Sequence, residues 1–180
     1  MDASRRHLLG IKRRLNLDSL LKRQSLPLSG RHKVRLLYRQ EVEDFSCAPY
    51  QIHSVESLRL VEIDGLNYRY KFADRRALED AFSRREGCDE VIIVWRGYLT
   101  DATYANLALF DGQHWWTPAH PLLKGVRRSS LLAEGRIRPA VIRAADLKLF
   151  KEIKLINAML SLKDTRGVPV SKVLAPGQAW

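Results

Sequence analysis

The sequence has 180 residues with a formal net charge of +11, and its 46% hydrophobic and 28% charged content is typical of a globular protein rather than a disordered one. No apolar run approaches the roughly 20 residues of a membrane-spanning helix and no signal-type segment is present, so we expect a cytoplasmic protein without membrane contact. Two cysteines without metal-ligand or C-x-x-C spacing predict neither a disulfide framework nor a metal site, and dispersed basic residues without a recognised motif argue against a nucleic-acid partner.

The first third of the chain predicts two helices followed by short strands. Helical spacing covers residues 4–15 and 16–24, with Asn16 as the N-cap of the second helix. Asp64-Gly65 predicts a hairpin turn between the last two strands. The predicted strands, rich in Val, Leu, Ile and Tyr, are 32–40, 42–50, 57–63 and 66–71.

The remaining residues predict alternating helices and strands. A helix over 73–86, ended by Gly87 in a left-handed conformation, leads to the apolar run 89–95, which is typical of a buried strand. The next features are turns at Arg96-Gly97 and Asp111-Gly112, a short helix closed by Gly135, a helix over 143–151, and strands over 152–160 and 168–174. The pattern predicts a mixed α/β (α+β) fold with two small subdomains, 1–69 and 70–180.

Three positions suggest chemistry from the residues alone. Lys71 stands where a predicted strand meets a helix; a desolvated lysine attacks aldehydes, although its stem could simply pack while the amine reaches water. Gly125 stands at a predicted helix start, a geometry that binds phosphate, and an ordinary turn is the local alternative. Asp101 could pair with a protonated ring nitrogen or form an Asx turn.

Five motifs occur in a fixed order over residues 71–128: Lys71, "GCDEVIIV", "GYLTDATYAN", "TP" and "LLKGVRR". In this order they resemble the class IV aminotransferase family of pyridoxal-phosphate enzymes, which includes branched-chain and D-amino-acid aminotransferases and aminodeoxychorismate lyase. The resemblance implies the two-subdomain fold of the D-amino-acid aminotransferase type. Family members also have a strand and a His-x-x-Arg segment just before the aligned start, and this sequence begins inside that region.

The resemblance also implies roles for individual residues. Lys71 would be the catalytic lysine that holds pyridoxal 5′-phosphate, and Asp101 would face the pyridine nitrogen, where the family usually has glutamate. Arg127 replaces a common threonine of the phosphate loop and could substitute for the arginine of the His-x-x-Arg segment. The further cofactor-binding positions are Asn106, Gly125, Val126, Asn157 and Ala158.

The function expected from this resemblance is that of a lyase or an aminotransferase acting on an acidic amino substrate. A 4-amino-4-deoxychorismate lyase, which releases 4-aminobenzoate and pyruvate, is slightly favoured because the chain is basic. An amino-acid aminotransferase is the alternative, and a non-catalytic relative or basic binding protein is a second. Candidate substrate contacts are Arg35, Tyr38 and Lys124, and a homodimer is implied by resemblance.

Overall fold

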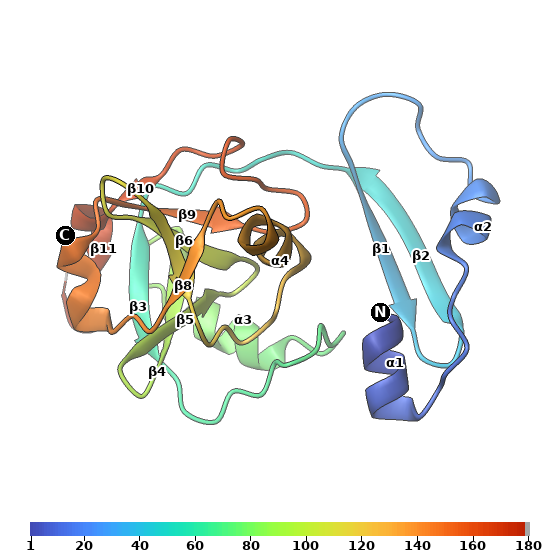
Figure 1. The fold of residues 1–180 in the computed structure, drawn as a ribbon, viewed down its shortest axis with the longest axis horizontal. Coiled ribbons are helices and arrows are strands. Elements are labelled where there is room, and N and C mark those ends of the chain that lie inside the picture. Colours follow the sequence, from blue (N-terminus) through green and yellow to red (C-terminus); the bar gives the residue numbers. More distant parts are fainter. Residues whose placement is uncertain (179–180) are drawn as a thin grey trace. The chain divides into compact units, whose positions relative to one another are not determined.

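A computed structural model describes residues 1–178, which form two compact units (Figure 1). The first unit is Met1–Gln51, and the second begins at Ile52. Within residues 1–178, no helix is long and apolar enough to cross a membrane.

The first unit consists of short helices and one antiparallel hairpin. Its elements are α1 (Asp2–Leu9), α2 (Leu17–Lys22), β1 (His32–Tyr38) and β2 (Val42–Pro49). The predicted cap of α2 is confirmed, because Asn16 Oδ1 accepts a hydrogen bond of 2.9 Å from the Ser19 N–H. Helix α1 is shorter than predicted and ends at Gly10, whose φ of +68° is left-handed.

Arg5 is the only buried side chain of the first unit, and it organises the unit by hydrogen bonding. Its Nε donates to the Arg39 carbonyl at 3.1 Å, its Nη1 to the Arg13 carbonyl at 2.7 Å, and its Nη2 to the Gln40 carbonyl. One guanidinium therefore joins α1, the segment after it and the β1–β2 turn. A planar group with five fixed donors can satisfy three separate carbonyls, whereas a lysine ammonium cannot reach all of them.

The second unit is built on a mixed nine-stranded sheet whose central order is β10-β9-β6-β5-β4-β3-β11, with β7 and β8 paired beside β6. Its strands are β3 (Leu58–Glu62), β4 (Glu90–Trp95), β5 (Tyr98–Ala102), β6 (Asn106–Phe110), β7 (Trp115–Pro118), β8 (Arg138–Ala140), β9 (Glu152–Ile156), β10 (Val168–Pro169) and β11 (Val173–Leu174). Its helices are α3 (Arg76–Ser83), α4 (Val126–Ala133) and the 3-10 helices Ala144–Leu149 and Val170–Lys172.

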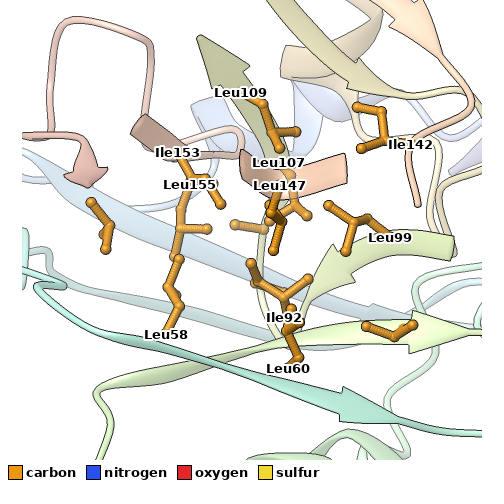
Figure 2. Close-up of a cluster of buried hydrophobic side chains, with 14 residues drawn as sticks. Leu58, Leu60, Ile92, Leu99, Leu107, Leu109, Ile142, Leu147, Ile153 and Leu155 are labelled. Atoms are coloured by element: carbon orange, nitrogen blue, oxygen red, sulfur yellow. The ribbon is translucent and has the colours of Figure 1, made fainter. Parts of the chain in front are cut away.

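The sheet encloses an apolar core made of alternate residues from neighbouring strands. Figure 2 shows side chains such as Leu58, Ile92, Leu107 and Ile153 converging from four different strands, and all four are fully buried. Val91 and Ile93, on the opposite face of β4, pack instead in the cluster that includes Leu78 of α3. Both faces of β4 are thus covered, which explains the continuous apolar run that predicted a buried strand.

The mixed α+β class is confirmed, but the connection between β3 and β4 differs from the prediction. The two strands pair in parallel, so Asp64-Gly65 cannot form the predicted hairpin, and residues 66–71 are not a strand. Parallel neighbours need a crossover, and residues 63–89, which contain α3, supply it. The predicted subdomain boundary near residue 70 lies inside this crossover, within the second compact unit.

Two further elements are also less regular than the sequence predicted. The helix expected over 143–151 is the 3-10 helix Ala144–Leu149, and the strand expected over 168–174 is split by the 3-10 turn Val170–Lys172. The split lets β10 pair with β9 while β11 pairs with β3, at opposite ends of the central order.

Replacing Arg5 with lysine should loosen the first unit alone. We expect amide hydrogen exchange in β1 and β2 to become about ten- to a hundredfold faster, because buried carbonyls that lose their donors cost about 1–3 kcal/mol. Hydrogen exchange read by mass spectrometry would measure this, with Arg6→Lys as the control, since Arg6 is an exposed residue of the same helix. Unchanged exchange in Arg5→Lys would contradict the organising role of the guanidinium.

Candidate active site

The β5–β6 hairpin carries a buried carboxylate at its centre. Asp101 and Asn106 are register partners across the hairpin, and their exposed fractions are only 4% and 5%. Asp101 Oδ1 accepts from Asn106 Nδ2 at 2.7 Å, and Asp101 Oδ2 accepts from the Leu123 N–H at 2.9 Å. Asn106 Nδ2 also donates to the Leu123 carbonyl at 2.8 Å. The hairpin is therefore bonded to the loop that precedes α4.

The surroundings of Asp101 leave its charge only partly compensated. Burial raises the pKa of the Asp101 carboxyl to about 6, although the Leu123 N–H, Asn106 and the positive charge of Arg128 each act to lower it. The Arg128 guanidinium itself is held by Thr117 Oγ1 at 3.2 Å and the Pro118 carbonyl at 2.7 Å. A carboxylate of this kind would be stabilised by a further cationic or protonated partner.

Gly125 brings the start of α4 against the same hairpin. A side chain at this position would overlap Asn106 Oδ1, so glycine is required by the close approach. The first intrahelical bond of this turn runs from the Ser129 N–H to the Gly125 carbonyl, and the N–H groups of Val126 and Arg127 precede it. A helix start with such N–H groups suits an anion, and phosphate in particular.

Arg127 connects α4 to the loop after β9. Its Nε lies 3.4 Å from the Asn157 carbonyl and its Nη2 lies 3.4 Å from the Ala158 carbonyl, at the outer limit of hydrogen bonding. The Asn157 side chain donates to the Tyr104 carbonyl in the β5–β6 turn at 3.3 Å. The structure thus brings together the six predicted positions Asp101, Asn106, Gly125, Arg127, Asn157 and Ala158, with Val126 at the start of α4.

Lys71 lies in the crossover between β3 and α3 rather than at the end of a strand, and it is exposed. Its neighbour Phe72 is fixed through its carbonyl, which accepts from the Tyr68 hydroxyl at 3.1 Å. Arg75, in the same segment, donates to the Thr103 carbonyl in the β5–β6 turn at 3.0 Å. The Lys71 segment is therefore attached to the hairpin that contains Asp101.

The three candidate substrate contacts are divided between the two units. Arg35 is exposed on β1, and the Tyr38 hydroxyl shares a hydrogen bond of 2.9 Å with Ser4 Oγ, so both belong to the first unit. Lys124 is exposed in the second unit, beside Gly125. Their role in substrate binding stays a prediction.

Sequence reasoning missed four polar residues near the hairpin: Arg75, Glu90, Thr103 and Arg128. Glu90 is 2% exposed at the start of β4, and Arg128 is 6% exposed in α4. A charged residue that opens an otherwise apolar buried strand, as Glu90 does in "DEVIIV", is the one signal that could have marked this group.

The comparisons with known proteins establish the family. The model of the family "Amino-transferase class IV" matches residues 16–172, which is most of the chain. The chain belongs to this family, and the prediction of a pyridoxal-phosphate enzyme of the class IV type is confirmed at the level of the family.

Relatives of known sequence or structure agree with this assignment. An uncharacterized protein of Haemophilus influenzae is 35% identical over 147 residues, which are 82% of this chain and 78% of that protein. A Haemophilus somnus crystal structure with the provisional name 4-amino-4-deoxychorismate lyase is 30% identical, with a TM-score of 0.80, and the match covers 89% of this chain and 84% of that one. A Mesorhizobium loti structure provisionally named amino-acid aminotransferase is 25% identical, with a TM-score of 0.65 and coverages of 88% and 78%.

The raised pKa of Asp101 predicts an unusual pH dependence of stability for the cofactor-free protein. Between pH 3.8 and about 6 the folded state binds a proton on Asp101 that the unfolded chain does not, so this residue's contribution falls as pH rises through that window. At pH 7 the difference between the pKa values of Asp101 in the folded and unfolded states lowers the free energy of unfolding by about 3 kcal/mol. Urea unfolding of wild type and Asp101→Asn at pH 5 and pH 7 should show that wild type loses more stability than the variant.

Glu90 is shared by both proteins and has its pKa raised chiefly by burial, so it contributes equally to the two pH profiles. An identical pH response in wild type and Asp101→Asn would mean that Asp101 is not the titrating group.

Proposed function

We propose that this protein is a pyridoxal-phosphate-dependent lyase that converts 4-amino-4-deoxychorismate to 4-aminobenzoate and pyruvate. The observation that carries the proposal is the buried Asp101 carboxylate, which is bonded to Asn106 and Leu123, while Asn106 in turn lies against the helix start at Gly125. One side of this arrangement suits a protonated ring nitrogen and the other suits a phosphate.

The cofactor phosphate would be bound by the start of α4 and the loop after β9. The N–H groups of Val126 and Arg127 would donate to phosphate oxygens, and glycine at position 125 leaves the approach free of a side chain. The Arg127 guanidinium would add a positive charge and hold the Asn157–Ala158 loop in place. Arg127 stands where the family commonly has threonine, and we propose that its charge takes the phosphate-binding role of the arginine in the family's His-x-x-Arg segment.

The ring end rests on Asp101. A raised pKa means that this carboxylate is poorly compensated, and a protonated pyridine nitrogen would supply the missing partner. When bound, pyridoxal phosphate supplies an electron-accepting ring that stabilises negative charge on a substrate carbon. Asp101 would keep the nitrogen protonated, while Asn106 orients the carboxylate through its 2.7 Å bond.

Lys71 is our candidate for the residue that binds the cofactor covalently and moves the substrate proton. Its Nζ would take the proton from the amine-bearing substrate carbon and deliver it to the departing enolpyruvyl group, which leaves as pyruvate while the ring becomes aromatic. The exposed position of Lys71 allows its amine to reach a bound molecule.

The lyase is preferred to the aminotransferase for two reasons. The provisionally named lyase structure matches at 30% identity and a TM-score of 0.80, against 25% and 0.65 for the provisionally named aminotransferase. A formal charge of +11 also suits a dicarboxylate substrate. We further propose that the protein acts as a cytoplasmic homodimer, with Lys124 near a substrate carboxylate.

Replacement of Lys71 by alanine should abolish covalent cofactor binding without unfolding the protein, because the side chain is exposed. Wild type mixed with pyridoxal phosphate should develop a visible absorbance band, and borohydride should then fix the cofactor to the peptide that contains Lys71. Lys148→Ala, at an exposed lysine of the same unit, is the control and should keep the band. Labelling of a different lysine would disprove the assignment.

The products of turnover distinguish the two candidate reactions. With 4-amino-4-deoxychorismate as the sole substrate, the lyase should release 4-aminobenzoate and pyruvate in equal amounts, measured by chromatography. An aminotransferase should be inert until an amino donor and a keto acid are both present. Asp101→Asn should lower turnover by about a hundredfold or more, because an amide cannot hold the ring proton.

If the protein binds the cofactor but is inactive in both assays, the result would favour the alternative that it is a non-catalytic relative of these enzymes.

A further inference from the structure

A series of hydrogen-bonded polar groups in the second unit connects the Lys71 segment to the hairpin that contains Asp101. Its central member is Arg75, whose Nη1 donates to the Tyr68 hydroxyl at 3.3 Å and whose Nη2 donates to the Thr103 carbonyl at 3.0 Å. The backbone of Arg75 also begins α3, because its carbonyl accepts from the Leu78 and Glu79 N–H groups at 2.9 Å. One residue therefore fixes the helix start, the crossover and the hairpin turn together.

At the Lys71 end of this series of hydrogen bonds, Tyr68 fixes Phe72, the residue next to Lys71. The Tyr68 hydroxyl donates to the Phe72 carbonyl at 3.1 Å, and the two rings meet edge to face with centroids 6.3 Å apart. Tyr68 is itself buried, with 8% of its surface exposed, in the cluster formed with α3 and β4. Lys71 is exposed, but the backbone beside it is held by a buried side chain.

At the other end, Thr103 is held by a buried carboxylate on β4. Thr103 Oγ1 lies 2.9 Å from both carboxylate oxygens of Glu90, and Glu90 Oε1 also accepts from the Val91 N–H at 2.8 Å. Burial raises the pKa of Glu90, and the charge of Arg75 counteracts that rise. Thr103 lies in the turn between Asp101 and Asn106, so its bond to Glu90 attaches the middle of that turn to β4, while Asp101 and Asn106 are held by their own bonds to each other and to Leu123.

We propose that Arg75, Thr103 and Glu90 are positioning residues that hold Lys71 Nζ within reach of the aldehyde of a cofactor bound beside Asp101. The inference rests on the proposed function of Lys71. In the covalent step the Lys71 nitrogen forms a double bond to the aldehyde carbon, and the aldehyde oxygen leaves as water. That step requires the two reacting atoms to approach to about 3–3.5 Å, and an error of about 1 Å can cost a hundredfold in rate.

The residues that would bind the cofactor differ from those that would position Lys71. Asn106, Gly125 and Arg127 would bind the ring and phosphate whether or not a lysine is present, because the hydrogen bonds of Asn106 and Arg127 run to Asp101, Leu123 and the Asn157–Ala158 loop rather than to Arg75. Arg75 and Thr103 would affect only the placement of Lys71 relative to the bound ring. Loss of the hydrogen bonds made by Arg75 and Thr103 should therefore slow formation of the covalent bond between Lys71 and the cofactor. The non-covalent affinity for the cofactor should stay nearly unchanged.

The test compares two measurements on each purified variant. The first is the rate constant for growth of the visible band at saturating pyridoxal phosphate. The second is the dissociation constant of 4-deoxypyridoxine 5′-phosphate, which has the ring and the phosphate but no aldehyde. In Arg75→Gln, the rate constant should fall about tenfold or more while the dissociation constant stays within about threefold of wild type.

Arg84→Gln is the matched control, because it makes the same substitution at the C-cap of α3, where the Arg84 guanidinium pairs with the exposed Asp80 carboxylate at 2.9 Å. It should change neither measurement. A second pair avoids the change of charge: Thr103→Val should slow capture, and Thr103→Ser, which keeps the hydroxyl, should restore it. This pair also answers the question if Arg75→Gln fails to fold.

The outcomes are distinguishable. Rate constants equal to wild type in Arg75→Gln and Thr103→Val overturn the inference, and so does a parallel loss of affinity for the aldehyde-free analogue, which would indicate a general structural role. A wild-type protein that forms no band, or that forms it on another lysine, overturns the proposed function itself.

Discussion

The burial of one carboxylate governs the arrangement of the second unit around its candidate site. Asp101 is 4% exposed and needs donors on both oxygens, since an unpaired buried charge would be strongly destabilising. Asn106 and the Leu123 N–H supply them, and in doing so they bring together the β5–β6 hairpin and the loop before α4. The resulting approach is so close that position 125 must be glycine. An unusually high pKa is the consequence of this burial, and it prepares the site for a protonated partner.

The β5–β6 turn is the point at which four segments of the chain meet. Arg75 reaches it from the crossover, Glu90 from β4 and Asn157 from the loop after β9, while Leu123 bonds to the residues that flank it. The apolar cluster in Figure 2 includes side chains of β5 and β6, the two strands that this turn connects. The first unit is stabilised differently, because its one buried side chain is a guanidinium that bonds to three carbonyls. Apolar packing supports the site, and polar bonds define its geometry.

Local chemistry determined much of what the sequence could predict. The Asn16 cap and the hairpin at Asp111-Gly112 depend on a few consecutive residues, and both are present. Gly87 has the expected positive φ, but α3 ends earlier than predicted, at Ser83 with Arg84 as its C-cap. The buried strand β4 followed from a run of apolar residues that needs cover on both faces. The order of five motifs was sufficient to identify the family, because each motif is a short segment whose chemistry does not depend on the rest of the chain.

Tertiary structure decided whatever depends on partners distant in sequence. Asp64-Gly65 has the composition of a hairpin turn, but β3 pairs in parallel with β4, and this pairing leaves residues 66–71 in an irregular crossover. The bonds from Arg75 to Thr103 and from Thr103 to Glu90 span 28 and 13 residues, so no local pattern announces them. The sequence by itself determined the motifs and the family. Only the folded chain decided how Lys71 is attached to the Asp101 hairpin, because long-range hydrogen bonds and burial exist only after the strands have paired.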